Sequence, residues 1–246
     1  MRPVSELAIK LYADGADLKG MRELSRKPWI RGFTTNPTLM RRAGVADYRA
    51  FAIEALHAIS DRPVSFEVFS DEFGEMADQA REIATWGPNV FVKIPVTNTR
   101  GEPSVDVVRE LTSRGVQVNV TAILGLDQVR DAVGALRGGS PAYISVFAGR
   151  VADTGRDPVP LMAAALELAR MAPNVELIWA SPRELLNIYQ ADAIGCHIIT
   201  VTDDILKRLA LVGKDLRAYS LETVQMFRND ALRAGYTLPL PAKTKA

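Results

Sequence analysis

A lysine interrupts one of the most apolar stretches of the chain. Residues 89–101 read NVFVKIPVTNTRG, and Lys93 stands among β-forming side chains in a run bracketed by glycine and proline. Burying an ammonium group is costly unless the group is paired or gives up its proton. An amine that is kept dry and loses its proton becomes a nucleophile, which attacks a carbonyl carbon to form a Schiff base.

This chemistry places a demand on the residues around the lysine. An iminium formed on a carbonyl compound withdraws electrons from the neighbouring carbon–carbon bond, and aldol cleavage follows if a base removes the proton of the β-hydroxyl group. Asp14, inside the β-rich segment LYADG, is the candidate base. Glu67, in VSFEVF, is a second carboxylate in a strand-like segment. A structural ion pair between Glu67 and Lys93 is an equally good interpretation of these two residues alone.

Eight short β-rich segments alternate with segments of helical periodicity, and these elements must position the chemical groups. We expect strands at residues 11–15, 30–36, 64–69, 90–96, 116–123, 143–149, 176–181 and 197–202. Strands that alternate with helices pair in parallel through right-handed crossovers. Eight such units in 246 residues predict an α/β protein with a (β/α)8 fold, the TIM barrel. A doubly wound open sheet is the alternative, but ADGADLKG after the first strand is not its usual GxGxxG turn.

Nothing in the composition marks a boundary between domains, so we expect a single barrel domain over residues 1–246. The segment 203–238 exceeds what the eighth strand–helix unit needs, and its second half has an apolar helical face. We therefore expect an extra C-terminal helix at residues 220–238, packed on the barrel or on a neighbouring subunit.

Polar side chains fall late in nearly every predicted strand, at the end where a TIM barrel carries its active site. They are Asp14, Thr34, Thr35, Asn36, Glu67, Lys93, Asn119, Thr121, Ser145, Ser181 and Thr202. For any single asparagine or threonine, satisfying a backbone group is the simpler explanation. Together they predict a ring of polar groups at one mouth of the barrel, and therefore an enzyme rather than an interaction scaffold.

The composition excludes several other classes of protein. The chain has 48% hydrophobic and 24% charged residues and a net charge of +1, so we expect neither a nucleic acid nor a membrane as partner. With Cys196 as its one cysteine, the chain can form no internal disulfide, which is typical of a reducing, cytoplasmic setting. No His, Cys and carboxylate residues follow metal-ligand spacing, so we expect no metal and no other cofactor.

Several of these segments together resemble the transaldolase family, which includes the fructose-6-phosphate aldolases. LYADGADL is similar to its first strand, GFTTNPTL to its TTNP motif, and FVKIPVT to its Schiff-base lysine motif. The segments SFEVFS, NVTAI, SVFAGRVAD, WASPRE and AIGCHIITVT follow in the family order. TTNP and VKIP in this order are far more specific than either motif alone. The family is a (β/α)8 barrel with its lysine on the fourth strand, where the strand order places Lys93.

The resemblance implies a role for each candidate residue. Lys93 would form the imine with the donor ketose, and Asp14 would act as the base on its C4 hydroxyl group. Glu67 and Thr121 would hold the water molecule that carries protons during imine formation. The substrate-binding residues would be Asn36, Asn119 and Ser145 for the dihydroxyacetone part, Arg150, Ser181 and Arg183 for the sugar phosphate, and Thr34 and Phe147 beside them. A solvated surface charge is the alternative for each arginine.

The implied enzyme is a transaldolase of the pentose phosphate pathway. It would move a dihydroxyacetone unit from a ketose phosphate, such as fructose 6-phosphate, to an aldose phosphate, such as erythrose 4-phosphate. The alternative is an aldolase that releases free dihydroxyacetone. Family members that resemble the transferases carry Glu and Phe where this chain has Glu67 and Phe147, whereas the aldolases carry Gln and Tyr. A barrel that binds sugar phosphates without turnover is a third hypothesis, which the intact set of costly polar residues disfavours.

Two departures from the family pattern concern the substrate. The sixth strand reads Ser145-Val146-Phe147 in place of the common SPF, and Pro182 stands between Ser181 and Arg183. Because proline fixes φ, it can re-aim Arg183, and another anionic sugar, for example a sulfonated one, is then an alternative substrate. Short family members assemble through a C-terminal helix, so the resemblance also implies a homo-oligomer, such as a pentamer or decamer.

Overall fold

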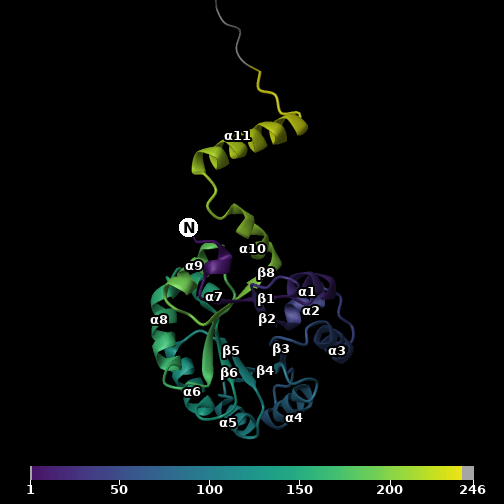
Figure 1. The fold of residues 1–246 in the computed structure, drawn as a ribbon, viewed down its shortest axis with the longest axis vertical. Coiled ribbons are helices and arrows are strands. Elements are labelled where there is room, and N and C mark those ends of the chain that lie inside the picture. Colours follow the sequence, from purple (N-terminus) through teal and green to yellow (C-terminus); the bar gives the residue numbers. More distant parts are fainter. Residues whose placement is uncertain (1, 240–246) are drawn as a thin grey trace, which may run out of the picture. The chain divides into compact units, whose positions relative to one another are not determined.

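In the computed structural model, which describes residues 2–239, eight parallel strands close into a barrel that is surrounded by helices (Figure 1). The strands are β1 (Lys10–Asp14), β2 (Ile30–Thr34), β3 (Val64–Glu67), β4 (Val90–Pro95), β5 (Val118–Ile123), β6 (Ala142–Val146), β7 (Val175–Trp179) and β8 (Ile198–Thr202). They follow one another around the barrel in sequence order, and β8 pairs with β1 to close it. The predicted (β/α)8 fold is confirmed, with strand ends within a few residues of those expected.

Helices lie in each connection between consecutive strands, and two more follow β8. They are α1 (Leu18–Ser25), α2 (Pro37–Arg42), α3 (Tyr48–Ala58), α4 (Phe73–Ala84), α5 (Val105–Ser113), α6 (Leu126–Leu136), α7 (Ala148–Ala152), α8 (Pro158–Ala169), α9 (Leu186–Ala193), α10 (Asp203–Lys207) and α11 (Leu216–Arg233). Several begin at a side-chain cap; Asp17, for example, accepts hydrogen bonds from the backbone N–H groups of Lys19 and Gly20. Within the described residues, no helix is long and apolar enough to cross a membrane.

Alternate residues along the strands belong to two different apolar cores, as the two-residue period of a strand requires. On β4, Val92 and Ile94 face the large outer core between strands and helices, whereas Phe91 faces a small core inside the barrel. Inside, the rings of Phe91 and Tyr143 stack with centroids 3.9 Å apart, and the hydroxyl oxygen of Tyr143 lies 2.9 Å from that of Tyr12. We call Tyr12, Phe91 and Tyr143 the aromatic floor. They precede Asp14, Lys93 and Ser145 by two residues each, so the floor lies one layer below these polar groups.

Beyond the barrel unit, residues 2–209, the chain forms a smaller unit that begins at residue 210. Its helix α11 begins at Leu216, earlier than expected, and ends at Arg233. Leu221, Val224 and Phe227 on this helix are exposed. A single domain over residues 1–246, the docking of this helix and the homo-oligomer stay predictions, and residues 1 and 240–246 lie outside the described residues.

The aromatic floor makes a prediction about Gly32, which pairs with Tyr12 across β1 and β2. A Cβ atom at Gly32 would lie 2.5 Å from the buried ring of Tyr12. We expect Gly32→Ala to lower the free energy of unfolding by about 1–3 kcal/mol, because an overpacked core cannot move the ring aside. Urea unfolding measures this change.

Gly134→Ala is the matched control. Gly134 is exposed within α6, and a Cβ there would meet nothing within 4 Å. The same substitution should raise stability by about 0.5–1 kcal/mol, because alanine is the better helix former. Equal effects of the two substitutions would contradict a tightly packed floor.

Candidate active site

A cavity of about 740 Å³ opens at the carboxyl ends of the strands. It is lined by nearly all of the residues that the sequence singles out: Asp14, Thr34, Asn36, Glu67, Lys93, Thr121, Ser145, Phe147, Arg150, Ser181 and Arg183. Asn119 is fully buried and contacts the cavity wall through Ser145, whose hydroxyl group donates to its Oδ1 atom. The barrel therefore brings the predicted residues together at one mouth.

Lys93 extends from β4 into this cavity and is only 8% exposed. Its Nζ atom donates a hydrogen bond of 2.6 Å to the backbone carbonyl oxygen of Thr35 and lies 3.9 Å from Oε2 of Glu67. Glu67 and Lys93 are direct partners in the register of β3 and β4, so both side chains point to the barrel interior. The amine is thus held in one place by a carbonyl group and a carboxylate.

Glu67 is 5% exposed and is poised to exchange a proton near neutral pH. Burial raises its pKa to about 7, although the charge of Lys93 and a hydrogen bond from the Thr35 hydroxyl group oppose the rise. Its Oε1 atom has no hydrogen-bond partner within residues 2–239. A buried oxygen of this kind is costly, which makes it available to a substrate or to solvent.

Asp14 ends β1 and faces the same cavity. Burial raises its pKa, and the charge of Lys93 is the largest opposing influence, followed by two hydrogen bonds. Thr34 Oγ1 donates to Oδ1 at 2.7 Å, and Asn36 Nδ2 donates to Oδ2 at 3.3 Å. The Asn36 amide is itself fixed, because its oxygen caps α2 by accepting from the backbone N–H of Leu39. The TTNP segment is therefore both a helix start and the cradle of this carboxylate.

Thr121 lines the cavity beside a β-bulge in β5. The pairing of β5 with β6 shifts between Val120 and Ile123, and Ala122 between them has a φ of 64°. Bulges of this kind are common next to active sites. The Thr121 hydroxyl oxygen is buried and has no hydrogen-bond partner among the described residues, like Oε1 of Glu67.

Two arginines, Arg150 and Arg183, also line the cavity. Arg150, on α7, is exposed, and its guanidinium carbon lies 5.7 Å from the centre of the Phe147 ring. Arg183 forms a two-pronged ion pair with Asp153, in which Nε donates to Oδ1 at 2.8 Å and Nη2 donates to Oδ2. This pair uses one edge of the guanidinium group and leaves the N–H groups of Nη1 outside it.

The loops that carry these arginines are in backbone contact. Ser181 has a φ of 59°, which is uncommon for a residue with a side chain and occurs mainly where function requires it. A Cβ atom at Gly149 would overlap the carbonyl oxygen of Ser181. Glycine at position 149 therefore allows the loop after β7 to approach α7, which places Arg150 and Arg183 on the same cavity.

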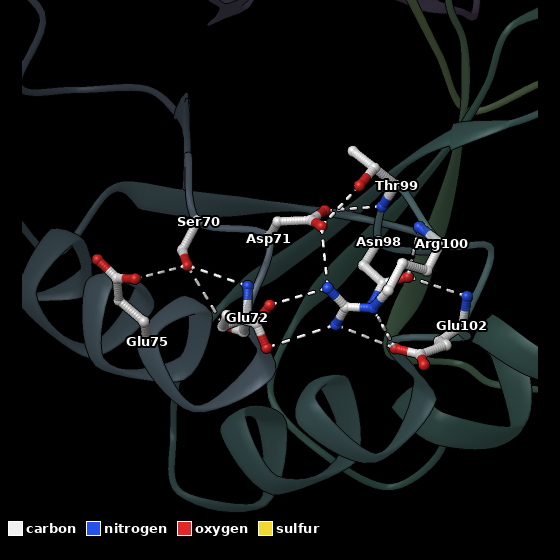
Figure 2. A network of polar contacts seen from close by, with 8 residues as sticks. All are labelled: Ser70, Asp71, Glu72, Glu75, Asn98, Thr99, Arg100 and Glu102. Carbon is white, nitrogen blue, oxygen red and sulfur yellow. Dashed lines mark hydrogen bonds and ion pairs between the residues drawn. The ribbon is translucent and has the colours of Figure 1, made fainter.

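A polar network joins the loops that follow β3 and β4, the strands of Glu67 and Lys93. Figure 2 shows Arg100 among three carboxylates, with Nη1 donating to Glu72 Oε1 at 2.8 Å. Beside it, the Thr99 hydroxyl group donates to Asp71 at 2.6 Å. Each of these exposed contacts contributes little alone, but together they tie the two loops to each other.

Some residues of the site are absent from the sequence-based prediction. Thr200 on β8 lines the cavity, and its hydroxyl oxygen lies 2.5 Å from that of Thr34. Because Thr200 and Thr202 share one face of a strand, the alternation that singles out Thr202 could have found it. Asp153 lies in a loop, where no pattern marks it. Within residues 2–239, no three His, Cys, Asp or Glu side chains are grouped to hold a metal ion.

Comparison with known proteins finds similarity of the whole barrel sequence to one enzyme family. Residues 11–239 match the family described as Transaldolase/Fructose-6-phosphate aldolase. A probable transaldolase of Dehalococcoides mccartyi is 31% identical over 202 residues, which cover 82% of this chain and 90% of that protein. A probable transaldolase of Streptococcus agalactiae serotype V is 36% identical over 196 residues, covering 79% and 86%.

A solved structure supports the fold alone. An HpcH/Hpal aldolase/citrate lyase family protein from Burkholderia cenocepacia J2315 has a TM-score of 0.58 at 15% identity, covering 89% of this chain and 95% of that one.

The raised pKa of Glu67 predicts how stability depends on pH. The folded protein holds this proton more tightly than the unfolded chain, so the stabilisation is complete below pH 4.5 and is lost as the pH rises toward about 7. Glutamine is neutral at every pH and removes this loss. We expect the free energy of unfolding of Glu67→Gln to rise relative to the wild type by up to about 1.4 kcal/mol per pH unit across this range.

Urea unfolding of both proteins at several pH values between 4 and 8 measures this difference. A difference that stays constant with pH would show that burial does not raise the pKa of Glu67.

Proposed function

The chain belongs to the transaldolase and fructose-6-phosphate aldolase family, and from this premise we propose that it transfers a dihydroxyacetone unit between sugar phosphates through a Schiff base on Lys93. The observation that carries the proposal is the buried Nζ atom of Lys93. It is fixed against the Thr35 carbonyl oxygen and Glu67, in the cavity that also contains Asp14. A ketone carbon that enters this cavity meets the amine, a carboxylate with a pKa of about 7, and a second carboxylate.

Imine formation needs a free amine and a route for protons. Lys93 attacks the C2 carbonyl of the donor ketose, and the resulting carbinolamine loses water to give the iminium. Glu67 is suited to take up and return protons during this step, because its pKa lies near neutral pH. Oε1 of Glu67 and the Thr121 hydroxyl oxygen, which have no hydrogen-bond partner within residues 2–239, are the acceptors for the water molecule involved.

Carbon–carbon cleavage then depends on Asp14. Its carboxylate removes the proton of the C4 hydroxyl group, the C3–C4 bond breaks, and its electron pair moves to the iminium nitrogen to form an enamine. The aldose phosphate leaves, and the enamine carbon attacks the aldehyde of the acceptor while Asp14 returns the proton. Asn36, Asn119 and Ser145 bind the hydroxyl groups of the dihydroxyacetone part in this proposal.

The arginines determine which end of the sugar points outward. Arg150 and the N–H groups of Arg183 that Asp153 does not use offer donors to an anionic head group, with the Ser181 hydroxyl group beside them. Phosphate is the head group that we propose, and a sulfonate presents the same oxygen acceptors. An enzyme that releases dihydroxyacetone from fructose 6-phosphate without an acceptor aldehyde would be an aldolase instead, which product analysis with and without acceptor decides.

Borohydride reduction tests the Schiff base directly. With fructose 6-phosphate present, we expect the intact mass of the wild type to gain one reduced dihydroxyacetone or hexose phosphate adduct, and Lys93→Ala to gain none. Lys10→Ala is the control, because Lys10 is an exposed lysine that pairs with Glu176 on the barrel surface. An adduct of equal yield on Lys93→Ala, or none on the wild type, would refute the mechanism.

Arg183→Ala tests the anion site. Hydrogen bonds to charged groups contribute about 1.5–3 kcal/mol, so KM for the phosphorylated donor should rise about 10- to 150-fold. Turnover of unphosphorylated fructose should change little, since it has no anionic group for Arg183 to bind. Arg156→Ala, at an exposed arginine outside the cavity lining, should leave both values unchanged. Equal losses with both substrates would contradict an anion-binding role.

A further inference from the structure

The Asp14 carboxylate is the end of a chain of hydroxyl groups that begins on β8. Thr200 is 6% exposed, and its Oγ1 atom lies 2.5 Å from Oγ1 of Thr34. Thr34 in turn donates to Oδ1 of Asp14 at 2.7 Å. A hydroxyl group has a single proton to donate. Because Thr34 gives its proton to Asp14, Thr200 must be the donor to Thr34.

We propose that Thr200 is a positioning residue for the catalytic base, acting through Thr34 to orient Asp14 and to favour its ionised form. The inference rests on the proposed function, in which Asp14 removes a proton as a carboxylate. Thr200 contacts neither Asp14 nor the reacting carbon atoms in this role.

The position of Thr200 on β8 explains how its hydroxyl group acts on Asp14 from a distance. In the register of β1 and β8, Thr202 pairs with Asp14, whereas Thr200 pairs with Tyr12 of the aromatic floor. Thr200 therefore approaches from the floor side and leaves the cavity side of the carboxylate open. Hydrogen bonds in a chain polarise one another, so a donor to Thr34 strengthens the bond that Thr34 makes to Asp14.

Asp14 needs this help because the groups around it act on its ionisation in opposite directions. Burial disfavours the ionised form of Asp14, while the charge of Lys93 favours it. From β2 and α2 it receives the donors Thr34 and Asn36. On β8 and α10, the Thr202 hydroxyl group donates to Asp204 instead, and Asp203 and Asp204 add negative charge near the mouth. The hydroxyl chain is then the contribution of β8 to the ionised state of Asp14.

Packing alone does not require a hydroxyl group at position 200. Valine has nearly the same shape, and the inward residue that precedes Thr200 on β8 is Ile198 of the inner apolar core. A buried hydroxyl group is costly unless it is hydrogen-bonded. The bond to Thr34 is therefore the specific gain that threonine provides here.

The test compares pH profiles of kcat/KM for sugar cleavage. With Thr200→Val we expect the midpoint of the acidic limb to shift to higher pH by about 0.5–1 pH unit, because the ionised form of Asp14 loses a hydrogen-bonded neighbour that stabilises it. We also expect kcat to fall about 3- to 10-fold, as is typical when one hydrogen bond is lost. The borohydride adduct on Lys93 should form in the same yield as in the wild type, because imine formation does not use Thr200.

Two further variants separate the hydroxyl group from side-chain bulk and from general destabilisation. Thr200→Ser keeps the donor and should restore the limb, whereas Thr200→Ala should behave like Thr200→Val; this pair decides the question even if the valine variant does not fold. Thr112→Val is the control, because Thr112 is similarly buried but its hydroxyl oxygen accepts from Ser140 on the outer side of the barrel.

The outcomes distinguish the two proposals. An acidic limb that stays in place in Thr200→Val and Thr200→Ala, with adduct formed, would overturn the role of Thr200. No adduct on the wild type would overturn the Schiff-base function itself, and the role of Thr200 with it.

Discussion

The contact between Lys93 and Glu67 is the interaction on which the rest of the site depends. Both side chains have left water, Nζ of Lys93 lies 3.9 Å from Oε2 of Glu67, and Oε1 of Glu67 has no hydrogen-bond partner within residues 2–239. Such a pair is expensive, because desolvation of both groups can exceed their attraction. A protein selected for stability alone would gain by replacing both with apolar residues. The neighbouring Thr35 carbonyl and hydroxyl groups hold the two side chains in place, and the outer apolar core provides the stability that the pair does not.

Strand alternation connects this pair to the remainder of the barrel. Because side chains change faces at every residue, each strand that packs its helices with one set of residues must present the other set to the barrel interior. Inside, the layer with Phe91 and Tyr143 closes the barrel, and the next layer holds Lys93 and Ser145. The aromatic floor therefore keeps bulk water away from the amine on one side. Within residues 2–239, the two residues with side chains that adopt positive φ, Ala122 and Ser181, lie beside this layer.

The strands could be predicted from the sequence because β-branched runs, bounded by glycine and proline, recur at an even spacing. The polar ring was also predictable, since a costly residue such as Lys93 inside an apolar run needs an explanation. Contacts between strands that are distant in the sequence could not be predicted. Nothing in the segment around Thr200 indicates that its hydroxyl group meets Thr34, because that contact depends on closure of β8 onto β1. The bond of Asp153 to Arg183 depends on how two loops pack, which no local pattern encodes. Tyr12 and Tyr143 look like ordinary strand residues until the barrel brings their hydroxyl groups together.

A crystal structure of the wild type, frozen within seconds of soaking in fructose 6-phosphate, tests the central claim most directly. The account predicts continuous density from Lys93 Nζ to C2 of the sugar, an Asp14 oxygen within hydrogen-bond distance of the C4 oxygen, and the phosphate beside Arg150 and Arg183. A sugar bound at the mouth, with Nζ unmodified and still donating to the Thr35 carbonyl oxygen, would contradict it.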